Sequence, residues 1–255
     1  SLRTRLSGHV SLSAGVVYVG CAGWTLSREH GSQFTAQGTH LERYASRLNA
    51  VEINSAFYRS HRPSTYARWG ACVGSDFRFS VKIPKSITHE SRLENCTGLL
   101  DTFLAECLAL EERLGCLLIQ LPPSLTFDPV IAGDFFEILR ARYSGSVVIE
   151  PRHKSWFDAQ ALLIDLRIAQ VAVDPSRIRN DRTPCGWSGL RYWRLHGAPQ
   201  IYYSAYEQEW IEARARQIAS TLADGVPTWC IFDNTARGAA LGNALHMKSL
   251  ITSSV

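Results

Sequence analysis

The sequence predicts an α/β fold, a (β/α)8 barrel of the TIM type with parallel strands. Eight short strand-like segments alternate with segments of helical periodicity. Most of the strand-like segments end in polar residues of one parity, which places those side chains on one face of the sheet. The chain has 255 residues, close to the length of about 250 that such a barrel needs. The functional site is therefore expected at the C-terminal ends of the strands.

The predicted strands are short, apolar and rich in β-branched residues. They cover residues 16–21, 49–54, 77–84, 116–121, 146–151, 169–174, 190–197 and 228–234. Residues 116–119 and 147–149 are continuously apolar, which is typical of parallel strands that are buried on both faces.

Between the strands, apolar residues recur every three or four positions, which indicates helices. This pattern occurs in residues 41–48, 66–69, 99–114, 131–139, 161–166, 211–222 and 240–250. Residues 175–189 lack it and contain Pro, Gly, Asn and Asp, so the helix after strand six is expected to be missing or replaced by a loop. The alternative fold is an open doubly wound sheet, but the G-x-G-x-x-G turn of dinucleotide-binding sheets is absent after the first strand.

Composition indicates a globular protein of a reducing compartment. Hydrophobic residues make up 45% and charged residues 20% of the chain, and no apolar run approaches the roughly 20 residues of a membrane span. The lack of such a run predicts no membrane partner, and the seven cysteines, which are odd in number and form no C-x-x-C pair, favour a cytoplasmic location. We expect residues 1–15 to form a loose N-terminal arm and residues 16–255 to form the barrel domain.

Basic residues concentrate in the segments that follow the strands. The net charge of +4 does not by itself indicate nucleic acid, but loops after the strands share one face of a barrel. The basic residues there include Arg59, Arg62, Lys85, Arg92, Arg152, Lys154, Arg177, Arg179 and Arg182. The placement predicts a mouth that attracts an anionic ligand. The alternative is a solvated rim of mixed charge, because Glu29, Glu90, Glu94 and Asp181 fall in the same segments.

Strand alternation also predicts a polar layer inside the barrel. Val51 and Ile53 point toward the helices if Glu52 and Asn54 point toward the barrel axis. The same parity gives Lys82, Gln120, Glu150, Arg152, Asp174, Arg194 and His196. A charge buried alone costs several kcal/mol, so these groups must pair with one another or bind a ligand. One interpretation is a closed salt-bridge layer of three cations and three carboxylates; the other is a binding floor.

His153 is the predicted proton-transfer residue, since an imidazole just beyond a strand end can exchange protons near neutral pH. Glu150 and Glu52 are predicted to assist it. The other predicted ligand-binding residues include rings suited to stacking and polar groups at strand ends. They are Trp24, Tyr58, Trp156, Asp174, Tyr206, His196, Asp233 and Asn234. No metal or other cofactor is expected, because no metal-ligand spacing such as H-E-x-x-H occurs and the interleaved cations would repel a metal ion.

Seven motifs, in order, resemble the YecE-like family, domain of unknown function 72. They are G-C-A-G-W at 20–24, V-E-I-N-S-A-F-Y at 51–58, F-R-F-S-V-K at 77–82, I-T-H at 87–89, Q-L-P-P-S at 120–124, E-P-R-H-K-S-W-F at 150–157 and R-L-H-G at 194–197. The resemblance implies a TIM barrel without an established activity. It implies a pocket of Trp24, Glu52, Asn54, Tyr58, Lys82, Gln120, Glu150, Arg152, His153, Arg194 and His196. Where many members have Phe-Asn-Asn-Asp after strand eight, this chain has Phe232-Asp233-Asn234-Thr235.

Three functional interpretations follow. The first is an enzyme that acts by acid–base chemistry on a small anionic or polar molecule, phosphorylated ones included, with Lys82, Arg152 and Arg194 holding the anion. The second is a nucleic-acid-binding or processing barrel, which a basic mouth with aromatic residues would suit. The third is a barrel that binds a ligand without catalysis.

Overall fold

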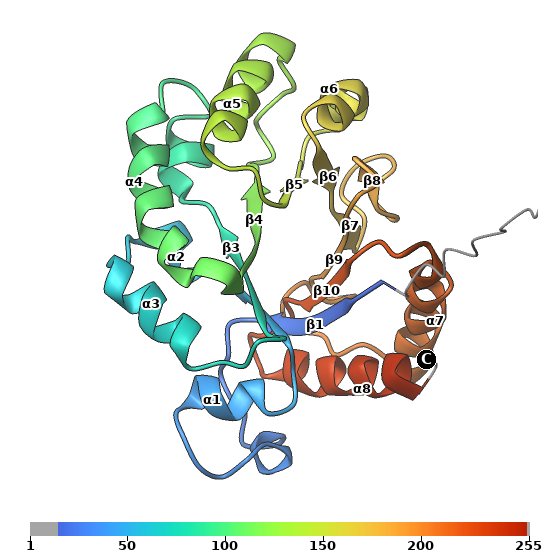
Figure 1. Cartoon of the computed structure of the whole chain (residues 1–255). Coiled ribbons are helices and arrows are strands. Elements are labelled where there is room, and N and C mark those ends of the chain that lie inside the picture. Colours follow the sequence, from blue (N-terminus) through green and yellow to red (C-terminus); the bar gives the residue numbers. More distant parts are fainter. Residues whose placement is uncertain (1–14, 254–255) are drawn as a thin grey trace, which may run out of the picture.

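The computed structural model describes residues 15–253, in which a nearly closed, mostly parallel barrel-like sheet is surrounded by helices (Figure 1). The strands are β1 (Val17–Ala22), β2 (Ala50–Ile53), β3 (Arg78–Lys82), β4 (Leu114–Gln120), β5 (Val147–Glu150), β6 (Ile168–Gln170), β7 (Ala172–Asp174), β8 (Cys185–Gly186), β9 (Arg191–Leu195) and β10 (Thr228–Phe232). Their order in the sheet is β7-β9-β10-β1-β2-β3-β4-β5-β6-β8. The predicted TIM-like barrel is confirmed.

The sixth predicted strand closes the barrel by changing partners. It is divided at Val171 into β6, which pairs with β5, and β7, which pairs with β9. The Val171 N–H still donates to Ile149 of β5, at 2.9 Å. This one stretch of chain therefore joins the two ends of the sheet.

The helices cover the outside of the sheet in chain order (Figure 1). They are α1 (His40–Ala45), α2 (Ser55–Tyr58), α3 (Pro63–Ala71), α4 (Thr97–Cys107), α5 (Pro129–Arg142), α6 (Gln160–Asp165), α7 (Gln208–Ala219) and α8 (Ala239–Ser253). Short 3-10 or π turns occur at η1 (Gly31–Gln33), η2 (Ser86–Glu90), η3 (Leu108–Arg113), η4 (Lys154–Ala159) and η5 (Leu222–Asp224). The long helix predicted over 99–114 ends at Cys107, and the 3-10 segment after it contains Glu111 at φ +54°.

Residues 175–189 form no helix, as predicted. Instead, the two-residue strand β8 pairs antiparallel with β6, a pairing that the sequence did not indicate. Gly186 has φ +70°, and a Cβ there would meet the Ile168 carbonyl oxygen at 2.8 Å, so the turn requires glycine. The buried Asp181 carboxylate orders the loop by accepting the Arg177 and Ile178 N–H groups at 2.6 and 2.8 Å.

The barrel interior has an apolar lower layer and a polar upper layer. On several strands a buried apolar or aromatic residue is followed two positions later by a buried polar one, because alternate side chains face the axis. These pairs are Ala50 and Glu52, Leu118 and Gln120, Val148 and Glu150, and Tyr192 and Arg194. The larger apolar cluster lies between the sheet and the helices. The lower layer holds the barrel together, and the upper layer forms the floor of the mouth.

The predicted N-terminal arm lies outside the described residues except for Gly15, whose N–H donates to the Leu222 carbonyl at 2.8 Å. No helix between residues 15 and 253 has the length and apolar character needed to span a membrane.

Candidate functional site

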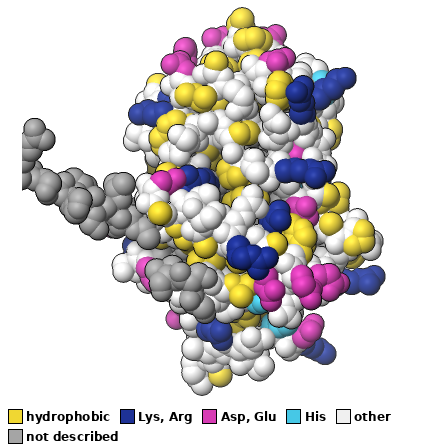
Figure 2. Space-filling view, turned by 90° about the vertical axis from the view of Figure 1, so that its right-hand side faces the viewer, with side chains coloured by type: hydrophobic (Ala, Val, Ile, Leu, Met, Phe, Trp, Pro, Cys, Tyr) yellow, Lys and Arg dark blue, Asp and Glu magenta, His cyan; other side chains and the backbone are white. Residues whose placement is uncertain are grey.

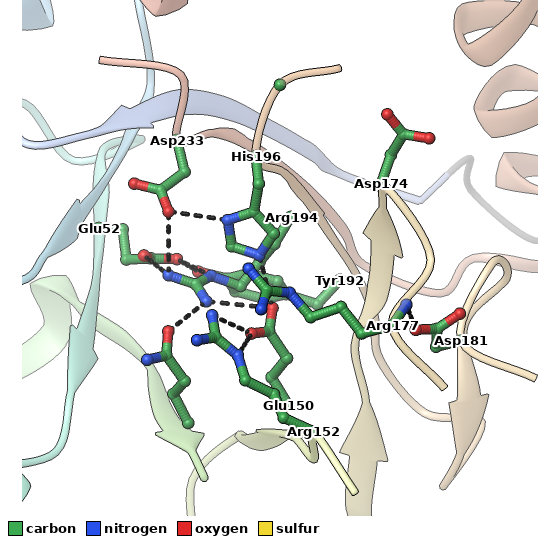
Figure 3. Close-up of polar contacts among 12 residues, drawn as sticks. Glu52, Glu150, Arg152, Asp174, Arg177, Asp181, Tyr192, Arg194, His196 and Asp233 are labelled. Carbon is green, nitrogen blue, oxygen red and sulfur yellow. Dashed lines mark hydrogen bonds and ion pairs between the residues drawn. The ribbon is translucent and has the colours of Figure 1, made fainter. Parts of the chain in front are cut away.

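Arg194 is at the centre of the polar layer and contacts three strands other than its own (Figure 3). Its Nη2 and Nε donate to Glu52 Oε1 and Oε2 at 2.6 and 3.1 Å. Its Nη1 donates to Gln120 Oε1 at 2.8 Å and to Glu150 Oε1 at 3.1 Å. Arg194 and Glu52 are fully buried, and the fork of the guanidinium is satisfied on all sides. We call Glu52, Gln120, Glu150, Arg152, Tyr192, Arg194, His196 and Asp233 the Arg194 network.

Glu150 receives two more donors in addition to Arg194. Arg152 approaches Oε2 through Nε at 2.9 Å and Nη2 at 2.8 Å, and His196 Nε2 lies 2.9 Å from Oε1. Burial alone would raise the pKa of Glu150, but Arg194, His196 and Arg152 outweigh burial and hold that pKa well below its usual value. Glu150 is therefore an ionised, fully engaged carboxylate.

Tyr192 supports the network from the layer below. Its hydroxyl donates to Glu52 Oε2 at 2.7 Å and lies 2.9 Å from Ser80 Oγ. All three side chains are fully buried. Tyr192 lies two positions before Arg194, and Ser80 lies two positions before Lys82, so both side chains face the barrel axis. The alternation of strand residues could therefore have identified Tyr192 and Ser80 as well.

His196 bridges two carboxylates. Its Nδ1 is 2.8 Å from Asp233 Oδ2 and its Nε2 is 2.9 Å from Glu150 Oε1. Carboxylates only accept hydrogen bonds, so both ring nitrogens donate when His196 is protonated. Burial would lower the pKa of His196, but Glu150 and Asp233 raise it above the ordinary value. The Asp233 side chain is 14% exposed, so this pair extends from the buried network toward solvent.

Lys82 differs from the other buried cations of this site. It is 7% exposed, at the end of β3, and it makes no hydrogen bond or ion pair within the described part of the chain. Its Nζ lies 4.3 Å from the centroid of the Phe57 ring. Burial and the Arg194 charge lower the pKa of Lys82 to about 8, and the nearby carboxylates oppose this only in part.

Further cations gather on the Lys82 side of the mouth. Burial lowers the pKa of His89, and the charges of Arg152, Lys82, Arg92 and Lys85 lower it further. Four cations therefore act on one imidazole. In contrast, basic and acidic side chains are interspersed on the molecular face shown in Figure 2, as on an ordinary solvated surface.

Arg177 was predicted to lie on the basic rim but was not selected as a site residue. Figure 3 shows its side chain extending from the loop after β7 toward the Arg194 network. Its Nε is buried and has no hydrogen-bond partner among residues 15–253. Only the folding of the 175–189 loop around Asp181 places Arg177 there, and no local motif indicates that folding.

The structure places His153 and Trp156 outside the Arg194 network. His153 precedes η4, where its Nδ1 accepts the Ser155 N–H at 3.1 Å and contacts Ser155 Oγ at 2.8 Å. Trp156 is 1% exposed, and its Nε1 donates to the Leu125 carbonyl at 2.9 Å. In these contacts the two side chains hold the start of η4 against the barrel.

Other predicted site residues line the edges of the mouth. Asp174 Oδ2 accepts the Tyr206 hydroxyl at 2.9 Å, so this carboxylate balances no cation of the network. Asn234 Nδ2 donates to the Ser204 carbonyl at 2.9 Å and is fully buried. Asn54 follows β2, and its buried Oδ1 has no hydrogen-bond partner among the described residues.

The predicted aromatic residues lie farther out. Trp24 packs edge-to-face on Trp69 with ring centroids 5.0 Å apart. Tyr58 is 70% exposed and lies beside Phe57. Phe57 and Tyr58 line a cavity of about 310 Å³, so the ring that covers Lys82 also borders open space.

A second cavity, of about 390 Å³, lies between the loops that follow β1 and β10 and includes Gly23, Ser27, Thr235 and Arg237. Within residues 15–253, no three His, Cys, Asp or Glu side chains come together in a way that could hold a metal ion. The charged groups of the mouth are organised around cations instead.

Comparisons with known proteins agree with this architecture. A sequence model of the family described as "Protein of unknown function DUF72" matches residues 18–255. The UPF0759 protein YecE of Escherichia coli K12 is 32% identical over 145 residues, which are 56% of this chain and 50% of YecE. The chain thus spans about half the length of the curated relatives it matches.

Two solved structures of DUF72 family proteins are similar in fold. The one from Thermotoga maritima has a TM-score of 0.78 at 24% identity and covers 93% of this chain and 99% of its own. The one from Enterococcus faecalis has a TM-score of 0.78 at 20% identity and covers 93% and 96%. At these identities the likeness shows the barrel fold.

Proposed function

The chain belongs to the DUF72 family, as its motifs predicted, and from this premise we propose that it binds a small anionic molecule at the C-terminal mouth of the barrel and acts on it by acid–base chemistry. The family carries no established reaction, so the proposal rests on the residues of the mouth.

The observation that carries the proposal is the unequal pairing of the buried charges. The three carboxylates of the network, Glu52, Glu150 and Asp233, all contact cations or His196. Lys82 has no such contact within residues 15–253, although only 7% of it is exposed. A buried charge without a counterion is costly, and an anionic ligand would supply the missing counterion.

Each group then has a distinct role. Lys82 and Arg152, the latter 10% exposed, hold the anion at the edge of the network. Arg194 is saturated by protein groups, so its role is to orient Glu52 and Glu150 and not to contact the ligand. The exposed edge of the His196–Asp233 pair exchanges the proton.

His153 is the second candidate for proton transfer. Its Nδ1 is engaged with Ser155, so the reacting atom would be Nε2. The pair His196–Asp233 is favoured because it lies within the Arg194 network and its carboxylate, 14% exposed, contacts the ring at 2.8 Å, whereas His153 lies outside the network.

Ligand-induced thermal stabilisation tests the proposal. We expect inorganic phosphate, small carboxylates or small phosphorylated compounds to raise the melting temperature, because a ligand at 100 times its Kd adds about 2.7 kcal/mol. The rise should be lost in Lys82→Met and Arg152→Met and kept in Arg142→Met, which removes an exposed cation of α5. Equal stabilisation of all the variants would contradict the proposal.

A single-stranded oligonucleotide tests the nucleic-acid alternative. If it stabilises the protein better than any small anion, in a salt-dependent manner, that alternative is favoured.

A further inference from the structure

The surroundings of Lys82 favour the neutral amine as well as the binding of an anion. Only 7% of the residue is exposed, its Nζ lies 4.3 Å from the centroid of the Phe57 ring, and none of the described carboxylates lies within ion-pair distance of it. Arg has a permanent charge and a fork matched to carboxylate or phosphate, whereas Lys can also bind an anion but shifts its pKa readily when it is buried. A lysine in an apolar site beside another cation is instead poised to lose its proton.

The neutral amine of lysine is a nucleophile toward carbonyl carbon. With a pKa of about 8, roughly a tenth of the Lys82 side chains are neutral at pH 7, compared with less than a thousandth of ordinary lysines. The residue also lies at the C-terminal end of a barrel strand, where reacting groups of this fold are located.

We propose that Lys82 Nζ attacks the carbonyl carbon of a small anionic carbonyl compound, such as a 2-oxo acid, and forms an imine with it. The inference rests on the proposed function, since the anionic part of the same molecule must enter the cationic mouth. Arg152 and Arg177 are the groups that would hold its carboxylate or phosphate, because Arg152 is 10% exposed beside Glu150 and the Arg177 side chain extends toward the network (Figure 3).

The atoms balance without an added oxidant or reductant. The nitrogen lone pair forms the C–N bond, the carbonyl π electrons move to oxygen, and the nitrogen proton is transferred to that oxygen to give a carbinolamine. A second proton, from the His196–Asp233 pair, allows the hydroxyl to leave as water while the C=N bond forms. The product is a protonated imine, an electron sink for bond cleavage or proton removal at the adjacent carbon.

Reductive trapping tests this inference. The intact protein is mixed with glyoxylate or pyruvate and treated with sodium borohydride, and the adduct is located by peptide mass spectrometry. Hydride adds to the imine carbon, so the mass of the lysine peptide increases by the mass of the carbonyl compound less its oxygen atom. The chain has only three other lysines, Lys85, Lys154 and Lys248, which serve as internal references.

We expect Lys82 to be labelled at least about tenfold faster at pH 7 than Lys85 or Lys154, with a pH midpoint near 8. Lys82→Arg should keep the charge and the fold, as judged by circular dichroism, and lose the adduct. Labelling of Lys82 that is no faster than that of the exposed Lys154 would overturn the inference.

The same samples separate the two proposals. Phosphate and acetate carry no reactive carbonyl, so stabilisation by them that depends on Lys82, together with no trapped adduct, would leave the proposed function standing and reject the imine. An absence of both stabilisation and adduct would reject both.

Discussion

Arg194 and Lys82 are both buried cations at the C-terminal end of the same barrel, yet their surroundings are opposite. Arg194 donates to Glu52, Gln120 and Glu150, and its guanidinium is satisfied by the protein. Lys82 contacts an aromatic ring and makes no ion pair with any described residue. The difference teaches that burial alone does not identify a functional charge. The paired charge of Arg194 joins the strands at the floor of the mouth, whereas the charge of Lys82 is neutralised by no described side chain.

The side chains themselves explain the difference. Arginine presents several donors in one plane, so a single Arg194 can join β2, β4 and β5 to β9. Lysine is a point charge that can give up its proton when it is desolvated, so the site tolerates Lys82 without a counterion.

The largest expected effect is on the paired side. Arg194→Met leaves Glu52 and Glu150 buried without their main counterion, which should lower the free energy of unfolding by about 3–5 kcal/mol. Urea denaturation at pH 7 measures it. The matched control is Arg142→Met, which breaks an exposed pair with Asp101 and should cost less than about 1 kcal/mol. Equal losses in both variants would mean that the network does not support the fold.

Replacing Lys82 is expected to change the free energy of unfolding in the opposite direction, by stabilising the protein. The pKa of Lys82 is lowered from 10.5 to about 8, so folding carries a penalty below pH 8, where lysine is charged in both states, and none above pH 10.5. Lys82→Met should therefore raise the free energy of unfolding by up to about 3 kcal/mol at pH 7. The gain should disappear as the pH rises from 8 to 10.5. A loss of stability at pH 7 would show that Lys82 already has a stabilising partner.

The smallest effect concerns the edge of the network. Asp233→Asn removes the carboxylate that contacts His196, so the pKa of His196 should fall, as measured by NMR titration of the ring. Stability should fall by about 1–2 kcal/mol, the value of a hydrogen bond to a charged group.

The pH window of that loss follows from the two pKa shifts. Asp233 has a lowered pKa, so its contribution is present above about pH 3.8 and is lost as the pH falls through the folded value. His196 has a raised pKa, so its contribution is present below about pH 6.5 and is lost as the pH rises through its folded value. The difference between wild type and Asp233→Asn should therefore be largest between pH 4 and 6.5. A difference that does not change with pH would mean that the pair is not ionised.

Much of the site could be predicted because it follows from strand alternation. Glu52, Gln120, Glu150 and Arg194 were selected by parity alone, and the structure brings all four into contact. The choice between a closed salt-bridge layer and a binding floor depended on which charged side chains form ion pairs. The predicted balance used Asp174 as the third carboxylate, but Asp174 accepts the Tyr206 hydroxyl, and Asp233 contacts His196 instead.

The third carboxylate of the network is Asp233 and not Asp174 because of contacts outside the local sequence. Strand six breaks at Val171 and continues as β7 beside β9, where Asp174 meets Tyr206 from the loop that follows β9. Arg177 reaches the mouth only because Asp181, in the same loop, accepts the Arg177 and Ile178 N–H groups and fixes the path of the loop. Such contacts join residues of different loops, and sequence periodicity carries no information about them.

The sequence by itself determined the barrel, the polar layer at the ends of its strands and the family, because a two-residue period and ordered motifs are local properties of the chain. Only the tertiary structure decided which of the buried charges are neutralised by other side chains. That outcome depends on distances of a few ångströms between strands that are far apart in the chain, and those distances left Arg194 enclosed by carboxylates and Lys82 without an ion pair among the described residues.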